Sequence, residues 1–200
     1  GMVSLSSENR FLGAFLFSLG LFCIVQFKYG LFTGKVGYIV NRDLPYVAET
    51  AVTLVGNALG TLIAALLLRQ VRFFTSTVST MDVTISDRVQ ATVSGKIHDN
   101  PLSIFILAVF CGILMFTAVE GSRKCKEEKN FAGSLFVVVM PVMVFIICGF
   151  NHCIADMFYY FFAGCPEPSK AIVYFILAIA GNSVGGMIVP LLKKLSNQPL

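Results

Sequence analysis

Long uninterrupted apolar runs constrain the fold of this chain more than any other feature of its sequence. Five such segments follow one another along the 200 residues, at 11–32, about 46–68, 102–119, 131 to about 162, and 171–192. A run of roughly twenty apolar residues is what a helix needs to cross the hydrocarbon core of a bilayer. The segments do not alternate between apolar and polar residues, as the strands of a membrane barrel would. We therefore expect an all-α integral membrane protein.

The composition agrees with a membrane protein and disfavours several other classes. The chain is 56% hydrophobic and 13% charged, whereas soluble domains are about 45–50% apolar and about 25% charged. A net charge of +4 suits basic cytoplasmic loops and gives no reason to expect nucleic acid binding. The six cysteines are scattered without a C-x-x-C pair, which favours packing over metal ligands or disulfides. We expect neither a metal nor a cofactor.

The placement of lysine and arginine predicts an orientation. Basic residues are concentrated in the short loop 120–130 and near the C-terminus, and several of those on the opposite side fall in the long polar stretch 70–100. Charges in short loops orient a membrane protein more strongly than charges in long ones. We place the 120–130 loop and the C-terminus in the cytoplasm. The stretch 70–100 is a connection that could lie as a helix on the membrane surface.

Two passages of the sequence resemble each other. "GNALG" at 56–60 and "GNSVGG" at 181–186 each carry Gly-Asn followed by another glycine. Small residues let two helices approach closely, and a buried asparagine can hydrogen-bond across them. Each passage follows a glycine-interrupted segment, "YGLFTGK" at 29–35 and "CGFNH" at 148–152. Matching interrupted segments in two halves indicate an inverted-repeat transporter or channel.

This repeat predicts the domain organisation. We expect one transmembrane channel domain over 1–200, with a first-half repeat at 11–68, a connection at 70–100 and a second-half repeat at 102–194. The second half contains a plain helix, a broken helix and a Gly-Asn helix, whereas the first half contains only the last two. Repeats of three spans predict a sixth span before residue 11. We expect five of six spans to be present, with 1–6 as the tail of a missing first helix.

The interrupted segments are the candidate functional site. A helix broken at membrane depth frees backbone groups that cost several kcal/mol each in lipid, so breaks occur where protein or a water-lined cavity satisfies them. We expect breaks near Thr33 and Gly149 that face each other at mid-membrane. The amides of two restarting helices would attract an anion there. Thr33 offers a hydroxyl and His152 a titratable ring, and an ionisable residue at such a position indicates function.

Four motifs together resemble the formate–nitrite transporter family. They are L-F-T-G, G-N-x-x-G, G-F-x-H-x-x-A-x-M-F and G-N-x-x-G-G, and the resemblance runs in order from about residue 11 to 194. It implies an aquaporin-like protomer of six helices with an inverted repeat and two broken helices. It further implies a homopentamer in a bacterial inner membrane that passes small monovalent anions such as formate, nitrite, lactate or hydrosulfide. No enzymatic activity is implied.

The resemblance also assigns the residues of a pore. They are Leu31, Phe32 and Thr33 in the pore loop, His152 at the centre, Phe17, Leu21 and Phe145 at apolar constrictions, Lys96 at an outer vestibule, and Asn57 and Asn182 at the Gly-Asn sites. The chain departs from the family pattern at some positions. Asn151 stands where the family commonly has an acid, Asp156 replaces a common asparagine, and Lys35 follows the L-F-T-G motif in place of an asparagine.

The expected mechanism follows from the energetics of charge in apolar surroundings. Lys96 concentrates the anion at the vestibule, and the anion takes a proton within the pore because a bare ion would lose its hydration at high cost. Whether His152 donates that proton or only polarises the site stays open. Two alternatives also stay open: an aquaporin-like channel for neutral solutes, and a non-conducting remnant. A membrane enzyme would need paired acids or a metal cluster, which His152 and Asp156 alone do not supply.

Overall fold

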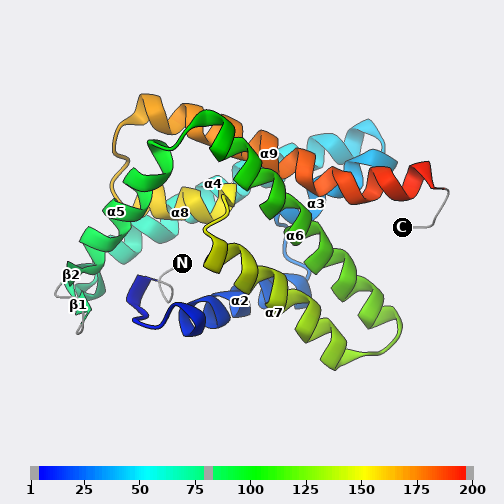
Figure 1. Cartoon of the computed structure of the whole chain (residues 1–200), viewed down its shortest axis with the longest axis horizontal. Coiled ribbons are helices and arrows are strands. Elements are labelled where there is room, and N and C mark those ends of the chain that lie inside the picture. Colours follow the sequence, from blue (N-terminus) through cyan, green and yellow to red (C-terminus); the bar gives the residue numbers. More distant parts are fainter. Residues whose placement is uncertain (1–4, 79–82, 197–200) are drawn as a thin grey trace.

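The computed structural model describes residues 5–78 and 83–196 as an assembly of helices (Figure 1). The elements in chain order are α2 (Arg10–Gln26), α3 (Phe32–Lys35), the 3-10 helix η1 (Val36–Asn41), α4 (Leu44–Arg69), the 3-10 helix η2 (Arg72–Thr75), β1 (Thr77–Val78), β2 (Val83–Thr84), α5 (Ile85–Ile97), α6 (Pro101–Glu127), α7 (Phe131–Cys148), α8 (Cys153–Phe162) and α9 (Pro168–Leu195). Most of the tail expected at 1–6 lies outside the described residues, which begin at Leu5.

Four helices of the described part are long and apolar enough to cross a membrane: α4, α6, α7 and α9. The apolar helices α2, with 17 residues, and α8, with 10 residues, are shorter. This is a multi-pass membrane protein built from helices, as the apolar runs predict. The run from 131 to 162 divides into α7 and α8, as expected for a segment too long for one span. In the first run, however, the helix already ends at Gln26, so the break lies at 27–31 and precedes Thr33.

Asparagine side chains begin three of these helices. Asn9 accepts hydrogen bonds from the backbone amides of residues 11 and 12, Asn100 from residue 102, and Asn130 from residue 133. Such side chains satisfy amides that a helix start leaves without an intrahelical partner. At the other end of α7, Gly149 adopts a left-handed conformation with φ of 72°, which terminates the helix without steric strain. Local sequence thus fixes where the second break begins.

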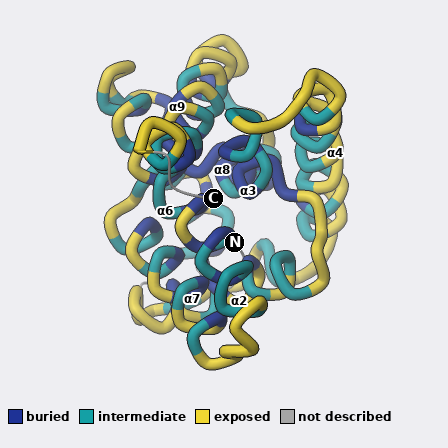
Figure 2. Tube along the Cα trace, turned by 90° about the vertical axis from the view of Figure 1, so that its right-hand side faces the viewer, coloured by how far each residue is buried: buried dark blue, intermediate teal, exposed yellow. Residues whose placement is uncertain are grey.

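Close backbone contact joins α6 to α9, and glycines make it possible. A Cβ atom added at Gly185 would lie 2.0 Å from the Val109 carbonyl oxygen, and one added at Gly112 would lie 2.3 Å from the Asn182 carbonyl oxygen. Figure 1 shows α6 crossing α9, with α2 alongside α7, and α8 packs against α4. In Figure 2, α4 stands at one side of the molecule with much of its surface exposed. The two breaks meet between these helix pairs.

The connection 70–100 is more ordered than we predicted. Its helix α5 buries Ile85, Val89, Val93 and Ile97, which recur at every fourth position. This helix contacts α8, so α5 belongs to the folded body. The spacing of four is visible in the sequence.

The connection also contains a small antiparallel hairpin that the sequence does not predict. β1 pairs with β2 through Thr77 opposite Thr84 and Val78 opposite Val83. Strands of two residues are too short for an alternating pattern to reveal them.

Candidate functional site

The first break occupies residues 27–31, between α2 and α3. The chain turns at Lys28, whose φ is 58°, and it is extended at Leu31. The helix that restarts, α3, has four residues and continues as the 3-10 helix η1. We expected two helical N-termini at the breaks. Only after the second break does the chain continue as a longer helix. After the first break, the glycine and β-branched residues that follow Thr33 favour a tighter, less regular turn.

Asn57 on α4 holds the first break together. Its side-chain oxygen accepts the backbone amide of Phe32 at 2.9 Å, and its nitrogen donates to the carbonyl oxygen of Gly30 at 2.9 Å. One side chain therefore satisfies a donor and an acceptor on either side of Leu31. Without it, both groups would lose their partner within the protein.

Asn182 on α9 holds the second break in the same way. Its side-chain oxygen accepts the amide of Cys153 at 2.9 Å, and its nitrogen donates to the carbonyl oxygen of Asn151 at 2.8 Å. The same nitrogen also donates to the carbonyl oxygen of Ala108 on α6 at 2.8 Å. His152 lies between the two bridged residues, as Leu31 does in the first break. The inverted repeat therefore places Leu31 and His152 at equivalent positions.

His152 connects the second break to the first. One ring nitrogen, Nδ1, accepts the backbone amide of Ala155 at 3.2 Å and so caps α8. The other, Nε2, lies 3.1 Å from the Thr33 hydroxyl oxygen, and both residues are buried. Because Nδ1 accepts a hydrogen bond, the hydrogen of a neutral ring resides on Nε2 and is donated to Thr33. The hydroxyl hydrogen of Thr33 is then directed away from the ring.

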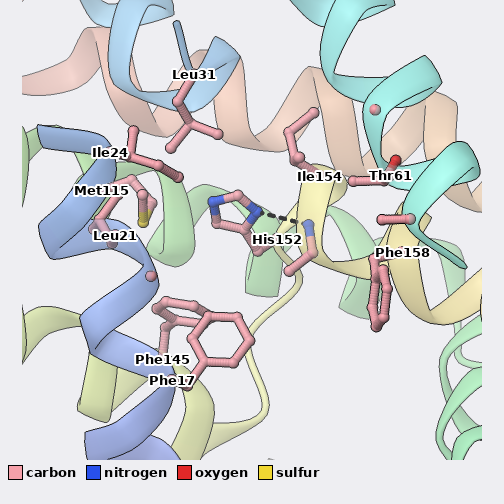
Figure 3. A pocket seen from close by; sticks show the side chains of 14 residues that line it. Phe17, Leu21, Ile24, Leu31, Thr61, Met115, Phe145, His152, Ile154 and Phe158 are labelled. Atoms are coloured by element: carbon pink, nitrogen blue, oxygen red, sulfur yellow. Dashed lines mark hydrogen bonds between the residues drawn. The ribbon is translucent and has the colours of Figure 1, made fainter. Parts of the chain in front are cut away.

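A central cavity of about 270 Å³ lies beside His152 (Figure 3), and Thr33 is not among the residues that line it. In Figure 3 the His152 ring projects into it, with Leu31 on one side and Phe17 and Phe145 on the other. The Phe145 ring stacks on the His152 ring at 5.6 Å and meets the edge of Phe17 at 5.8 Å. The lining is mainly apolar and comprises Phe17, Gly20, Leu21, Ile24, Leu31, Gly60, Thr61, Ala64, Met115, Phe145, His152, Ile154, Ala155 and Phe158.

Two wider cavities adjoin the central one. A cavity of about 980 Å³ shares Ile24 and Leu31 with it, and a cavity of about 390 Å³ shares Phe145 and Ala155. We call the first the Leu31 vestibule and the second the Phe145 vestibule. The three cavities thus follow one another, with an apolar side chain at each junction.

Positive charge predominates in both vestibules. The Leu31 vestibule is lined by five basic residues and one acidic residue: Lys28, Lys35, Arg42, Arg123, Lys126 and Glu49. The Phe145 vestibule is lined by three basic and two acidic residues: Arg10, Arg88, Lys96, Glu8 and Asp156. Both mouths therefore attract anions, and the Leu31 vestibule has the larger excess of positive charge.

Lys96 lies at the edge of the Phe145 vestibule with its charge paired. Its ammonium donates to the Asn151 side-chain oxygen at 2.8 Å and lies 3.2 Å from an oxygen of Asp156. The Tyr174 hydroxyl donates to Asp156 at 2.6 Å. Two positions that depart from the family pattern, Asn151 and Asp156, therefore meet on one ammonium group. The sequence gives no sign of Tyr174, because it is an aromatic residue in an apolar span.

The other expected residues fall into two groups. Leu21 lines the central cavity with Phe17 and Phe145, whereas Phe32 is buried outside its lining. Asn57 and Asn182 act on the backbone of the breaks. We did not predict Ile24, although it shares one face of α2 with Phe17 and Leu21 at helical spacing, which could have revealed it.

Comparisons with known proteins agree with this architecture. The family model described as "Formate/nitrite transporter" matches residues 2–194. The formate channel FocA of Haemophilus influenzae is 28% identical over 75% of this chain and 52% of its own length. The uncharacterized transporter YrhG of Bacillus subtilis is 29% identical over 91% of this chain and 69% of its own. A solved "Pentameric formate channel with formate bound" superposes with a TM-score of 0.73 at 22% identity, over 98% of this chain and 89% of that structure.

The lengths of the matched proteins differ from that of this chain. It spans about half of the Haemophilus influenzae relative, 52%, and somewhat more than two thirds of the Bacillus subtilis one, 69%. At 22% identity, the similarity to the solved channel shows the fold and leaves the substrate to be argued from the site.

Proposed function

The chain belongs to the formate/nitrite transporter family, and we propose that it forms a membrane channel for small monovalent anions such as formate. One observation carries this proposal. A narrow apolar cavity, with His152 in its wall and Thr33 hydrogen-bonded to that histidine, lies between two vestibules with an excess of positive charge. Such an arrangement gathers anions at both ends and offers them little polar contact in the middle.

The apolar junctions determine the form in which the substrate crosses. A monovalent anion that passes Leu31 or Phe145 without water pays a large desolvation cost, and the corresponding neutral acid does not. We therefore propose that the anion takes up a proton and crosses as a weak acid. The substrate meets His152 in the wall of the central cavity, and Thr33, hydrogen-bonded to Nε2 outside the cavity lining, orients the ring. Nitrite, lactate and hydrosulfide fit the same requirements of charge and size.

The assembly and location are part of the proposal. The outward faces of α4, α7 and α9 are apolar and exposed, which suits contact with lipid or with further copies of the chain. A solved structure with this fold is described as a pentameric formate channel, and the named relatives of known activity include a bacterial formate channel. We propose a homopentamer in the bacterial inner membrane, with the Leu31 vestibule on the cytoplasmic side.

Reconstitution of the purified chain into liposomes tests the function. We expect uptake of labelled formate above that of empty liposomes and no swelling in glycerol. Glycerol swelling without formate uptake would instead identify a channel for neutral solutes. Absence of both activities would contradict the proposed function.

A second arm tests proton linkage. Formate uptake should rise as the external pH falls from about 8 to about 5, because a larger fraction of the substrate is then neutral. His152→Asn retains a side chain that can cap α8 but removes the imidazole, so its pH profile should be flatter at equal protein density. Identical profiles for the two proteins would exclude a proton role for His152.

A further inference from the structure

A buried polar cluster lies behind the second break, away from the central cavity. It consists of Lys96 from α5, Asn151 from the break, Asp156 from α8 and Tyr174 from α9. Asn151, Asp156 and Tyr174 are each at most 4% exposed, and the Lys96 side chain is 20% exposed. None of these four is among the residues that line the central cavity. The cluster thus joins three helices to the residue that immediately precedes His152.

The contacts form a chain in which each residue orients the next. The Tyr174 hydroxyl donates to Oδ2 of Asp156 at 2.6 Å, and Asp156 in turn accepts the Lys96 ammonium, 3.2 Å from Oδ1. Lys96 also donates to Oδ1 of Asn151 at 2.8 Å. The other end of the Asn151 amide donates to the Ile104 carbonyl oxygen at 3.2 Å. Within this cluster, the Lys96 ammonium links Asp156 on α8 to Asn151 in the loop that carries His152.

The placement of the carboxylate is the unusual element of the cluster. A partly buried ammonium among buried partners is stabilised by an opposite charge, because an unpaired charge there would be destabilising. Either of its two side-chain partners, at 151 or at 156, is close enough to provide that charge. In this chain position 156 carries the carboxylate and position 151 the neutral amide. Asp156 also lies in the first turn of α8, where the helix dipole favours negative charge.

We propose that Asp156 and Tyr174 are positioning residues of the pore: through Lys96 they hold Asn151, and with it the His152 loop, and the carboxylate and amide at 156 and 151 are interchangeable. The inference rests on the proposed function, since it assigns these residues to the same pore. It makes Lys96 part of the scaffold of the second break and not a free charge that collects anions.

The alternative role for Lys96 predicts the opposite kinetics. If Lys96 mainly attracted anions, Asp156→Asn would release its charge and raise formate uptake at low concentration by lowering KM. If Asp156 positions the loop, the same change lowers the maximal rate with little change in KM. We expect a loss of about tenfold or more, since misplacement of a site residue by about 1 Å can reduce a rate by up to two orders of magnitude.

Exchange of the two side chains is the decisive experiment. Asn151→Asp alone places two carboxylates against one ammonium and should also reduce uptake. The double variant Asn151→Asp/Asp156→Asn restores one carboxylate and one amide, and we expect it to regain at least about half of the wild-type maximal rate, well above either single variant. Glu167→Gln is the matched control, because it removes a carboxylate from an exposed lysine pair with Lys170 and should leave uptake unchanged.

Hydrogen exchange at residues 149–156, measured in detergent by mass spectrometry, provides a readout that does not depend on transport. We expect faster exchange in Asp156→Asn and wild-type protection in the double variant. A lower KM in Asp156→Asn, or a double variant no better than the single variants in rate and protection, would overturn the proposal. If Asp156→Asn does not fold, the double variant is compared with wild type, and its failure to fold would also overturn it. If the wild type carries no formate, the proposed function fails and the exchange data alone decide the inference.

Discussion

The helices α4 and α9 carry the same Gly-Asn motif in very different surroundings. In both, the asparagine bridges the backbone of a break through two hydrogen bonds, and Asn182 makes a third to Ala108 on α6. The glycines differ. Gly185 lies directly against the backbone of α6, whereas within the described part of the chain nothing approaches the Cβ direction of Gly56 or Gly60 within 4 Å. Accordingly, 33% of an apolar 18-residue stretch of α9 is buried inside the protein, against 6% of the corresponding stretch of α4.

This difference shows that the motif combines two separable tasks. The asparagine satisfies the backbone groups of a broken helix and does so on both helices. The glycines permit close helix contact, and in the described residues those of the α9 motif meet α6 and η1, whereas those of the α4 motif meet no neighbour within 4 Å. A repeated motif therefore predicts the first task in both halves, and the second task depends on which helix lies opposite.

The largest effect is expected at Gly185. In Gly185→Ala the new methyl group would meet the Val109 carbonyl oxygen, which belongs to the backbone and cannot move aside without separating α6 from α9. Overpacking of this kind destabilises by about 1–3 kcal/mol or more. Thermal unfolding in detergent micelles should show a clearly lower midpoint. A midpoint equal to that of wild type would mean that the two helices are not in backbone contact.

An intermediate effect is expected from removal of the asparagines. Asn182→Ala removes the side-chain partner of the buried Cys153 amide and of the Asn151 carbonyl, and each unsatisfied group costs about 1–3 kcal/mol. Asn57→Ala removes two hydrogen bonds at a half-buried position, where water can replace part of them. Unfolding midpoints and formate uptake should both fall further for Asn182→Ala. Equal losses would show that the two breaks are equally shielded from water.

The smallest effect, of opposite sign, is expected at Gly60. The position is exposed within α4, so Gly60→Ala meets no steric obstacle and gains helix propensity of up to about 1 kcal/mol. The unfolding midpoint of this 200-residue chain should be unchanged or slightly raised. A marked decrease would instead show that another helix covers this face of α4 in the assembled protein. The glycines of both motifs would then serve close helix contact.

Much of the fold follows from the sequence because bilayer physics restricts it. The lengths of the apolar runs predict the spans, and Gly149 with its following polar residues predicts where α7 ends. Our prediction of where the first break begins was less accurate. The helix stops at Gln26 because Lys28 takes a left-handed conformation, and a lysine gives no signal of that. The role of α5 was missed because its stripe of four apolar residues is short and interrupted by polar ones.

The candidate site could be predicted only in part. Thr33 and His152 stand out as polar residues in apolar segments, and the structure brings them within 3.1 Å of each other. The partners of Lys96 could not be inferred, because Lys96 and Tyr174 come from stretches of chain distant from Asn151 and Asp156. Contacts between distant segments depend on how the helices cross, and a single sequence contains no direct record of those crossings.

His152 meets two demands with the two edges of one ring. Nδ1 completes the start of α8, and Nε2 faces Thr33 and the cavity. Asparagine, aspartate and serine can begin a helix as well as histidine does, yet none of them extends a second donor so far from the backbone. Few amino acids satisfy both conditions, so position 152 should tolerate far fewer substitutions than position 31, its counterpart in the other half. An inverted repeat thus diverges most where one copy has taken on a second task.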